Sequence, residues 1–315
     1  MPALITGAGG FVGRHLATLL RRDGIEHLVG IEARPVAAVD DMEMITCDLL
    51  DRDHVGRVIA HYRPQIIFHL AAQAYVPKAV AAPAETLINN AVAQINVLEA
   101  SRASCPEAII VVVGSSEEYG LAAPDDMPLD EDQPFRPTNA YAVSKIAQDM
   151  LGLQYHLSYG SRVVRVRPFN HIGPGQSDRF VVSSMARQIA EAEAGSSDPV
   201  ILVGNLQAER DFLDVRDVVS AYALVARAEF SGQVFNVASG IPRPIGALLE
   251  RLVSMAQCEI LVREDPSRLR ASDVPVVFGD AARLRLQTGW EPSVSLERSL
   301  SDTLDYWRLR IRTPV

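Results

Sequence analysis

Short apolar runs separated by helix-length stretches recur through the first half of the sequence, and they constrain its fold more than any other feature. The runs are ALIT (3–6), LVGIEA (28–33), EMITC (43–47), QIIFHL (65–70), IIVVV (109–113) and RVVRVRPF (162–169). Strands buried on both faces have such continuous apolar sequences, and parallel neighbours need a crossover that is usually a helix. The pattern therefore predicts an α/β fold with a doubly wound parallel sheet.

The pattern loosens after about residue 168, where RPFNHIGPGQ is rich in turn residues and EAGSSDP (193–199) is a polar loop. We therefore expect a first domain over 1–168 and a smaller lobe mainly over 169–315. The strand-like QVFNVAS (233–239) fits either part, and we expect segments near 212–240 to join the first domain.

Charge and cysteine content limit the partners and the compartment. The net charge of -9 argues against nucleic acid or an anionic membrane as a partner, since both need a basic surface. The three cysteines lack CxxC spacing, and no His and acid cluster has metal-ligand spacing, so neither disulfides nor a metal site is expected. No apolar run approaches the ~20 residues of a membrane span. A cytoplasmic protein is the simplest interpretation.

A glycine loop follows the first predicted strand and opens the first predicted helix, about 11–22. GAGGFVG places Gly7, Gly10 and Gly13 in GxxGxxG spacing. The first two glycines permit a tight turn and a close approach of a pyrophosphate to the helix N-terminus, and the third permits close packing of helix and sheet. Strand, loop and helix are in register, which favours dinucleotide binding over a purely structural turn.

Acidic residues follow the second and third predicted strands. Glu32 lies where an acid would accept hydrogen bonds from an adenosine ribose and disfavour a 2′-phosphate, which favours NAD(H) over NADP(H). Arg34 could instead pair with a 2′-phosphate, and a solvated charge is the alternative for Glu32. Asp48, followed by Leu49, is a candidate adenine contact or the cap of the helix that begins near Asp51.

A tyrosine and a lysine lie one helical turn apart in YAVSK, on a predicted helix that runs to residue 159. Tyr141 and Lys145 are at i and i+4, so their side chains share a face. An ammonium near a phenol is expected to lower the phenol pKa and to make it a proton donor to a carbonyl oxygen. Ser115, at the end of the fifth predicted strand, would supply a second hydrogen bond to that oxygen.

These residues, taken with the motifs around them, resemble the extended short-chain dehydrogenase/reductases, or NAD-dependent epimerase/dehydratase family, which act largely on nucleotide sugars. The resemblance covers nearly the whole chain through TGAGGFVG, FHLAAQ, GSSEEYG, YAVSK, RPFNHIGPGQ and ERDFLDVRD, in that order. It implies a Rossmann-type sheet with a C-terminal substrate-binding lobe, an NAD(H) or NADP(H) cofactor and a homodimer.

The resemblance also implies roles for individual residues. Ser115, Tyr141 and Lys145 match the catalytic set, Lys145 also holds the nicotinamide ribose, and Asn90 supports the active-site region. The positions that would lie along the cofactor, besides those already named, are Phe11, Val12, Leu70, Ala71 and Ala72.

Within the family, FNHIGPGQ, GNLQAERDF and LRASDVP look most like the reductases of GDP-4-keto-6-deoxy-D-mannose, which form GDP-D-rhamnose. This likeness implies that Asn170, Arg210 and Arg270 face the substrate diphosphate. Two arginines on separate loops can give bidentate, charge-assisted hydrogen bonds to phosphate oxygens even in an acidic chain.

The acids in GSSEEYG leave three functions open. Glu117 matches an acid that removes water in related 4,6-dehydratases, whereas SSEEYG as a whole resembles the GDP-sugar reductases. We favour reduction, with Ser116 and Glu117 bordering the sugar. A dehydratase or 4-epimerase with tightly held NAD⁺ is the alternative, and a non-catalytic dinucleotide sensor is the remote one, since a fold does not dictate function.

The remaining predictions concern the positions of two histidines and the helices of a dimer interface. His69 on its buried strand is expected to be a core residue, and His171 to line the pocket or hold its turn. The resemblance implies a dimer through helices near 84–103 and 141–159, whose outward faces carry Ile95, Leu98, Met150 and Leu157. Periodicity alone does not tell which of these four residues face a partner and which face the sheet.

Overall fold

The computed structural model describes residues 2–37, 39, 41–268 and 274–313. Its main layer is a seven-stranded sheet in which each neighbouring pair is parallel. The strands, in spatial order, are β10 (Val234–Val237), β6 (Arg162–Pro168), β5 (Ile109–Val113), β4 (Ile66–His69), β1 (Ala3–Thr6), β2 (Leu28–Glu32) and β3 (Glu43–Thr46). The predicted α/β fold with a parallel sheet is confirmed.

Both faces of this sheet are covered by helices, because alternate strand residues point to opposite faces. Ile5 of β1 belongs to one apolar cluster and its neighbour Leu4 to the other. The first cluster includes α1 (Phe11–Arg22), α7 (Val215–Val225) and α9 (Ala282–Thr288), and the second includes α2 (Arg52–Tyr62), α4 (Pro83–Ser104) and α5 (Ala140–Tyr159). Strands β1 and β4 are fully buried, whereas β3 at the edge is partly exposed.

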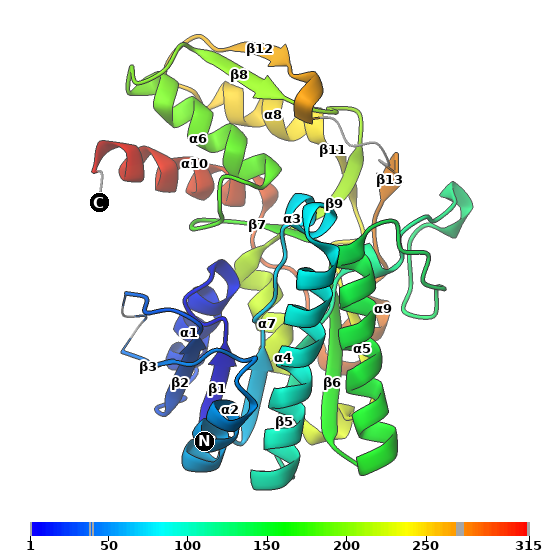
Figure 1. Cartoon of the computed structure of the whole chain (residues 1–315). Coiled ribbons are helices and arrows are strands. Elements are labelled where there is room, and N and C mark those ends of the chain that lie inside the picture. Colours follow the sequence, from blue (N-terminus) through cyan, green and yellow to red (C-terminus); the bar gives the residue numbers. More distant parts are fainter. Residues whose placement is uncertain (1, 38, 40, 269–273, 314–315) are drawn as a thin grey trace.

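A smaller lobe lies above the carboxyl ends of the strands (Figure 1). Its apolar cluster joins α6 (Val181–Glu193), α8 (Ile245–Ser254), α10 (Leu296–Arg312) and the strand β8 (Val200–Val203), which pairs with β12 (Leu261–Glu264). A small sheet joins the two parts through β7 (Asn170–Ile172), β9 (Glu209–Asp214), β11 (Pro242–Pro244) and β13 (Val276–Val277).

Short helical elements lie between the main helices and strands. The helix α3 (Val76–Ala81) precedes α4, and 3-10 turns occur at η1 (Ser116–Glu118), η2 (Pro124–Asp126), η3 (Ala228–Phe230) and η4 (Pro266–Arg268). The stretch 233–239, which fitted either part, contains β10, and β10 pairs with β6 of the large sheet. In the described part of the chain, none of the helices has the length and apolarity that a membrane span requires.

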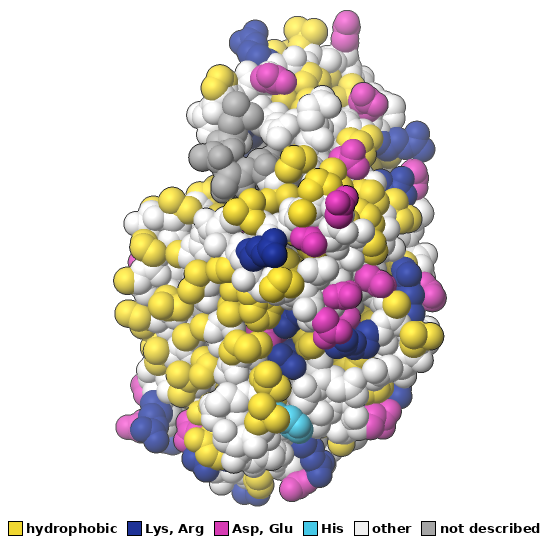
Figure 2. Space-filling model, turned by 90° about the vertical axis from the view of Figure 1, so that its right-hand side faces the viewer, with side chains coloured by type: hydrophobic (Ala, Val, Ile, Leu, Met, Phe, Trp, Pro, Cys, Tyr) yellow, Lys and Arg dark blue, Asp and Glu magenta, His cyan; other side chains and the backbone are white. Residues whose placement is uncertain are grey.

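The predicted outward faces of α4 and α5 need one correction. Leu98 is only 1% exposed and packs in the core, because the α4 stripe that faces the sheet includes Val97 and Leu98. Met150 and Leu157 of α5 are exposed at 36% and 73%. Apolar side chains also gather on the side of the molecule seen in Figure 2.

Candidate active site at the carboxyl ends of the strands

The glycine loop packs tightly between β1 and α1. Gly7 has φ +71°, and a Cβ there would lie 3.0 Å from the backbone nitrogen of Ala71. A Cβ on Gly13 would lie 2.4 Å from the carbonyl oxygen of Gly7. The N-cap of α1 is Gly10, without a side-chain cap, and the first turn of α1 has no acidic residue. The positive end of the helix dipole is thus left for an anion, which fits a dinucleotide pyrophosphate.

The segment after β4 runs beside this loop. Thr6 holds it, because its Oγ1 accepts a hydrogen bond from the Ala71 amide at 3.2 Å and its carbonyl accepts one from the Leu70 amide at 3.2 Å. Thr6 Oγ1 also lies 2.9 Å from Nδ1 of His69. His69 is buried, as expected of a core histidine. Thr6 was not predicted from the sequence, since a threonine at the end of an apolar strand carries no distinguishing signal.

The acids after β2 and β3 have different surroundings. Glu32 Oε1 accepts a hydrogen bond from the Gly9 amide at 2.8 Å, and Arg34 is exposed nearby in sequence. Asp48 accepts from the Leu50 amide at 2.9 Å, whereas Asp51 caps α2 through the His54 amide at 3.0 Å. The prediction that Asp48 could cap this helix is therefore wrong, because Asp51 directly precedes the first helical residue.

Ser115, Tyr141 and Lys145 converge at the end of β5. Ser115 follows β5 by two residues, and Tyr141 and Lys145 lie on α5. A side-chain hydrogen bond joins Ser115 to Tyr141, and Lys145 Nζ lies 6.0 Å from the centre of the Tyr141 ring. Lys145 Nζ donates to the Val113 carbonyl oxygen at 2.8 Å. An ammonium has three donors, so two remain for other partners.

The pKa of Tyr141 moves in the opposite direction from the prediction. Burial raises the pKa of Tyr141, and the hydrogen bond from Ser115 opposes this increase only in part. The Lys145 ammonium donates to the Val113 carbonyl oxygen, and burial lowers the pKa of Lys145 itself to about 8. Burial of Tyr141 therefore favours its protonated phenol, the form that can donate a proton.

Asn139 holds Glu117 beside the phenol. Asn139 Nδ2 donates to Glu117 Oε2 at 3.1 Å, and Asn139 Oδ1 caps α5 by accepting from the Ala142 amide at 2.8 Å. Glu117 and Ser116 are both partly exposed. Asn139 was not predicted from the sequence, although an asparagine before a predicted helix is an ordinary N-cap signal.

Asn90 ties the loop after β4 to α5. Its Oδ1 accepts from the Gln73 amide at 2.7 Å, and its Nδ2 donates to Ser144 Oγ at 2.9 Å. Asn90 is completely buried. This agrees with the supporting role that the family resemblance implies for Asn90.

The structure describes two of the three residues that were predicted to face the substrate diphosphate. Asn170 is exposed at the start of β7, and Arg210 of β9 donates to the carbonyl oxygens of Glu209 and Pro275 at 2.8 and 3.3 Å. Arg270 lies outside the described residues. His171 holds its turn, with Nδ1 3.1 Å from the Phe169 carbonyl oxygen.

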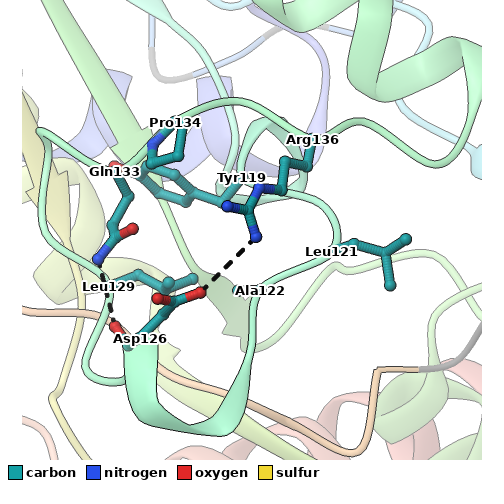
Figure 3. Close-up of a pocket in the computed structure, with 8 residues that line it drawn as sticks. All are labelled: Tyr119, Leu121, Ala122, Asp126, Leu129, Gln133, Pro134 and Arg136. Atoms are coloured by element: carbon teal, nitrogen blue, oxygen red, sulfur yellow. Dashed lines mark hydrogen bonds and ion pairs between the residues drawn. The ribbon is translucent and has the colours of Figure 1, made fainter.

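Two hollows lie near the candidate active site, and the residues that line them do not include Ser115, Tyr141 or Lys145. A groove of about 770 Å³ runs between the glycine loop and the small lobe, and its lining includes Gly9, Phe11, Arg14, Gln176 and Arg310. A smaller hollow lies in the loop after η1, where Arg136 and Asp126 point toward each other (Figure 3). The described residues contain no group of three or more His, Cys, Asp or Glu side chains suited to a metal ion.

Comparisons with known proteins agree with this fold. A family model described as GDP-mannose 4,6 dehydratase matches residues 4–303. The GDP-6-deoxy-D-mannose reductase of Pseudomonas aeruginosa is 39% identical over 98% of this chain and 97% of its own length. The structure of RMD from P. aeruginosa complexed with NADPH has 36% identity and a TM-score of 0.86, over 98% of this chain and 100% of that one. The Thermus thermophilus UDP-glucose 4-epimerase in complex with NAD has 26% identity and a TM-score of 0.87, over 98% and 99%.

Proposed function

The chain belongs to the GDP-mannose 4,6 dehydratase family within the extended short-chain dehydrogenase/reductases, and from this premise we propose that it reduces a 4-keto-6-deoxy sugar nucleotide. It is an NAD(P)-dependent oxidoreductase. The proposed reaction converts the C4 keto group of GDP-4-keto-6-deoxy-D-mannose to an alcohol and gives GDP-D-rhamnose. The observation that best supports this proposal is the 39% identity to a GDP-6-deoxy-D-mannose reductase over 98% of the chain.

The state of Tyr141 supports reduction. Reduction of a ketone needs a proton for the oxygen, whereas oxidation of an alcohol, the first step of a dehydratase or epimerase, needs a group that accepts one. Burial raises the pKa of Tyr141 and so disfavours the phenolate that would accept a proton in alcohol oxidation.

Each member of the catalytic set has a defined part in this reaction. A bound reduced nicotinamide dinucleotide supplies the hydride. Tyr141 donates its proton to O4, and Ser115 orients O4 with a second hydrogen bond. Lys145, fixed by the Val113 carbonyl, has two donors left for the nicotinamide ribose and the phenol oxygen. Glu117, held by Asn139, borders the sugar and orients its hydroxyls.

The cofactor is held by the glycine loop and the strand ends around it. The amides at the start of α1 bind the pyrophosphate, and Glu32 accepts from the adenosine ribose. The other residues of this proposed site are Gly7, Gly10, Phe11, Val12, Gly13, Arg34, Asp48, Leu49, Leu70, Ala71 and Ala72. The Glu32 to Gly9 hydrogen bond supports a preference for NAD(H), because a carboxylate fixed there repels a 2′-phosphate.

The substrate diphosphate is proposed to lie against the small lobe, which forms mainly from 169–315. Asn170, Arg210 and Arg270 would face it, and Ser116 would contact the sugar. Guanidinium groups on separate segments can each give paired hydrogen bonds to phosphate oxygens.

A second candidate function rests on Glu117. Glu117 accepts a hydrogen bond from Asn139 at 3.1 Å, and in this alternative its carboxylate would be the base that removes a proton from carbon. The family description names a dehydratase, so a 4,6-dehydratase or 4-epimerase with tightly bound NAD⁺ is the alternative.

The test is turnover of enzymatically made GDP-4-keto-6-deoxymannose with NADH or NADPH, with the product identified by NMR. We expect oxidation of the reduced cofactor and GDP-D-rhamnose. Tyr141→Phe should lower kcat by about 10²- to 10⁴-fold. Tyr155→Phe is the matched control, because Tyr155 is a buried phenol of the same helix that binds Glu99 instead.

Two other outcomes would contradict reduction. Dehydration of GDP-mannose by protein that releases bound NAD⁺ would favour the second candidate. Cofactor binding without turnover of either substrate would favour a sensor.

We also propose that the protein is a homodimer and that it functions in the cytoplasm. Exposed Ile88 of α4 and Leu157 of α5 support a shared helical interface, since these two helices pack side by side. Cys47, Cys105 and Cys258 are unpaired, which suits a reducing compartment.

A further inference from the structure

Glu118 is a buried carboxylate that the proposed reaction does not use. It ends the 3-10 turn η1 and is 0% exposed. Its side chain packs against Gly114, the residue that follows β5, and a Cβ at this position would lie 2.2 Å from Glu118 Oε1. Gly114 is therefore required for this carboxylate to occupy its position.

Glu118 fixes the backbone that carries the catalytic serine. Its Oε1 accepts a hydrogen bond from the Ser115 amide at 2.7 Å, while Ser115 Oγ accepts one from the Glu117 amide at 3.2 Å. Lys145 holds the same strand end from α5 through the Val113 carbonyl at 2.8 Å. The backbone from 113 to 115 is thus held by Glu118 and Lys145 together.

The other oxygen of Glu118 belongs to a buried charge cluster. Arg167 Nε lies 3.2 Å from Glu118 Oε2 and 2.9 Å from Asp149 Oδ2. Arg165 pairs with Asp149 at 2.6 Å. Glu118 Oε2 has no hydrogen-bond partner among the described residues, because the Arg167 donor is aligned with Asp149. Glu118 and Asp149 share the Arg167 guanidinium, but Asp149 also pairs with Arg165. Glu118 is therefore the less firmly paired of these two carboxylates.

We propose that Glu118 is a positioning residue of the reduction, which fixes the backbone amide of Ser115 on the strand end that Lys145 also holds through the Val113 carbonyl. The proposal rests on the reductase function proposed above. No part of it requires Glu118 to touch the substrate.

The charges around Glu118 and Lys145 determine the pH dependence. Burial raises the pKa of Glu118 to about 8, Asp149 adds to the increase, and Arg167 and Lys145 oppose it. Burial lowers the pKa of Lys145 to about 8, and Glu118 opposes this decrease. His69 and Tyr141 are the other titratable groups against Lys145. As pH rises, ionisation of Glu118 keeps Lys145 charged, and without this carboxylate Lys145 should lose its proton at lower pH.

The primary test is Glu118→Gln, which keeps an oxygen for the Ser115 amide but removes the charge. We expect the alkaline limb of kcat/KM for the keto sugar nucleotide to move to lower pH by about one unit. Binding of the reduced cofactor, followed by its fluorescence, should show the same displacement. This second readout needs no turnover, so it separates failure of this inference from failure of the reductase function.

Glu131→Gln is the matched control. Glu131 is also buried, accepts from the Asn236 amide at 2.8 Å and lies 3.5 Å from Arg283 Nε, but it has no role in the pKa of Lys145. We expect its pH profiles to match those of the unaltered protein. Equal profiles for Glu118→Gln and the unaltered protein, or the same displacement in Glu131→Gln, would overturn the proposal.

Gly114→Ala tests the positioning role without changing any charged residue. The added methyl group would displace the Glu118 carboxylate, and we expect kcat to fall about tenfold, or roughly 1.4 kcal/mol of barrier. Thermal melting identifies a variant that fails to fold. A folded Gly114→Ala protein with unaltered kcat would contradict the positioning role.

Discussion

The carboxylate of Glu32 and the backbone amide of Gly9 are joined by a 2.8 Å hydrogen bond, which ties the end of β2 to the glycine loop. One carboxylate oxygen is thereby fixed, and the other is left for a second donor. A Cβ on Gly9 would lie 3.2 Å from this same oxygen, so the loop and the acid fit closely. In the cofactor site proposed above, this hydrogen bond fixes a negative charge where cofactors with and without a 2′-phosphate differ.

Replacement of Glu32 by alanine should change cofactor preference toward NADPH. Removal of the charge relieves its repulsion of a 2′-phosphate and leaves Arg34 to attract it. We expect the ratio of kcat/KM for NADPH to that for NADH to rise at least about tenfold, or roughly 1.4 kcal/mol. Glu43→Gln is the control, since Glu43 is an exposed acid at the amino end of β3, whereas Glu32 lies at the carboxyl end of β2. An unchanged ratio in Glu32→Ala would refute the assignment.

Asn139 should affect stability and catalysis separately. Asn139→Ser keeps a capping oxygen for the Ala142 amide but cannot reach Glu117, so stability should change little while kcat/KM for the keto sugar falls about tenfold. Asp51→Ala should instead cost about 1 kcal/mol of unfolding free energy by removing the cap of α2, with activity retained. Urea denaturation and steady-state kinetics measure the two effects. Full activity in Asn139→Ser would show that Glu117 needs no such support.

The fold was predictable from sequence where the signal is local. The run ALIT, the glycine loop and the helix over 11–22 predict β1 and α1 within their observed bounds, because burial and helical periodicity act over a few residues. The i and i+4 spacing of Tyr141 and Lys145 likewise predicts their shared face.

Contacts between distant segments were not predictable. Glu118 looks like a solvated loop acid in GSSEEYG, but Arg167, 49 positions later on β6, makes its site a buried one. Leu98 was placed on the wrong face of α4 because that long helix has polar and apolar residues all round it. The raised pKa of Tyr141 depends on burial, which spacing alone does not give.

Gly13 and Gly56 should respond to alanine in opposite directions. A methyl group on Gly13 would lie 2.4 Å from the Gly7 carbonyl oxygen, so the glycine loop must move, and we expect a loss of about 1–3 kcal/mol of stability and weaker cofactor binding. Gly56 lies within α2 with open space around it, so Gly56→Ala should gain roughly 0.5–1 kcal/mol. Thermal melting and cofactor titration check both. A neutral Gly13→Ala would mean that the loop is not closely packed.

A charge on the outward face of α4 or α5 should prevent dimer formation. Ile88 and Leu157 are 54% and 73% exposed, and an aspartate at either would be buried unpaired in a helical interface. We expect Leu157→Asp to sediment as a monomer of about 34.3 kDa, with its fold retained. Leu286→Asp is the control, because Leu286 is 86% exposed on α9, away from both helices. Dimers of Leu157→Asp, or monomers of the unaltered protein, would contradict this interface.

His69 should make the protein less stable in mild acid. Burial lowers the pKa of His69 to about 3, and the Lys145 charge adds to the decrease. Below pH 6.5 the unfolded chain binds a proton at this imidazole and the folded chain does not. The stability contribution of the neutral imidazole is therefore present above pH 6.5 and is lost as pH falls toward 3, by about 1.4 kcal/mol per unit.

His69→Gln removes this titration while it keeps a polar side chain near Thr6. The difference in unfolding free energy between the unaltered protein and His69→Gln should shrink by roughly 2 kcal/mol between pH 7 and pH 5. Urea denaturation at the two pH values measures it. A difference that stays constant would mean that His69 is protonated in the folded protein. A protonated His69 would need a counter-charge at this buried strand end, next to Ala71. The described residues around Thr6 do not supply one.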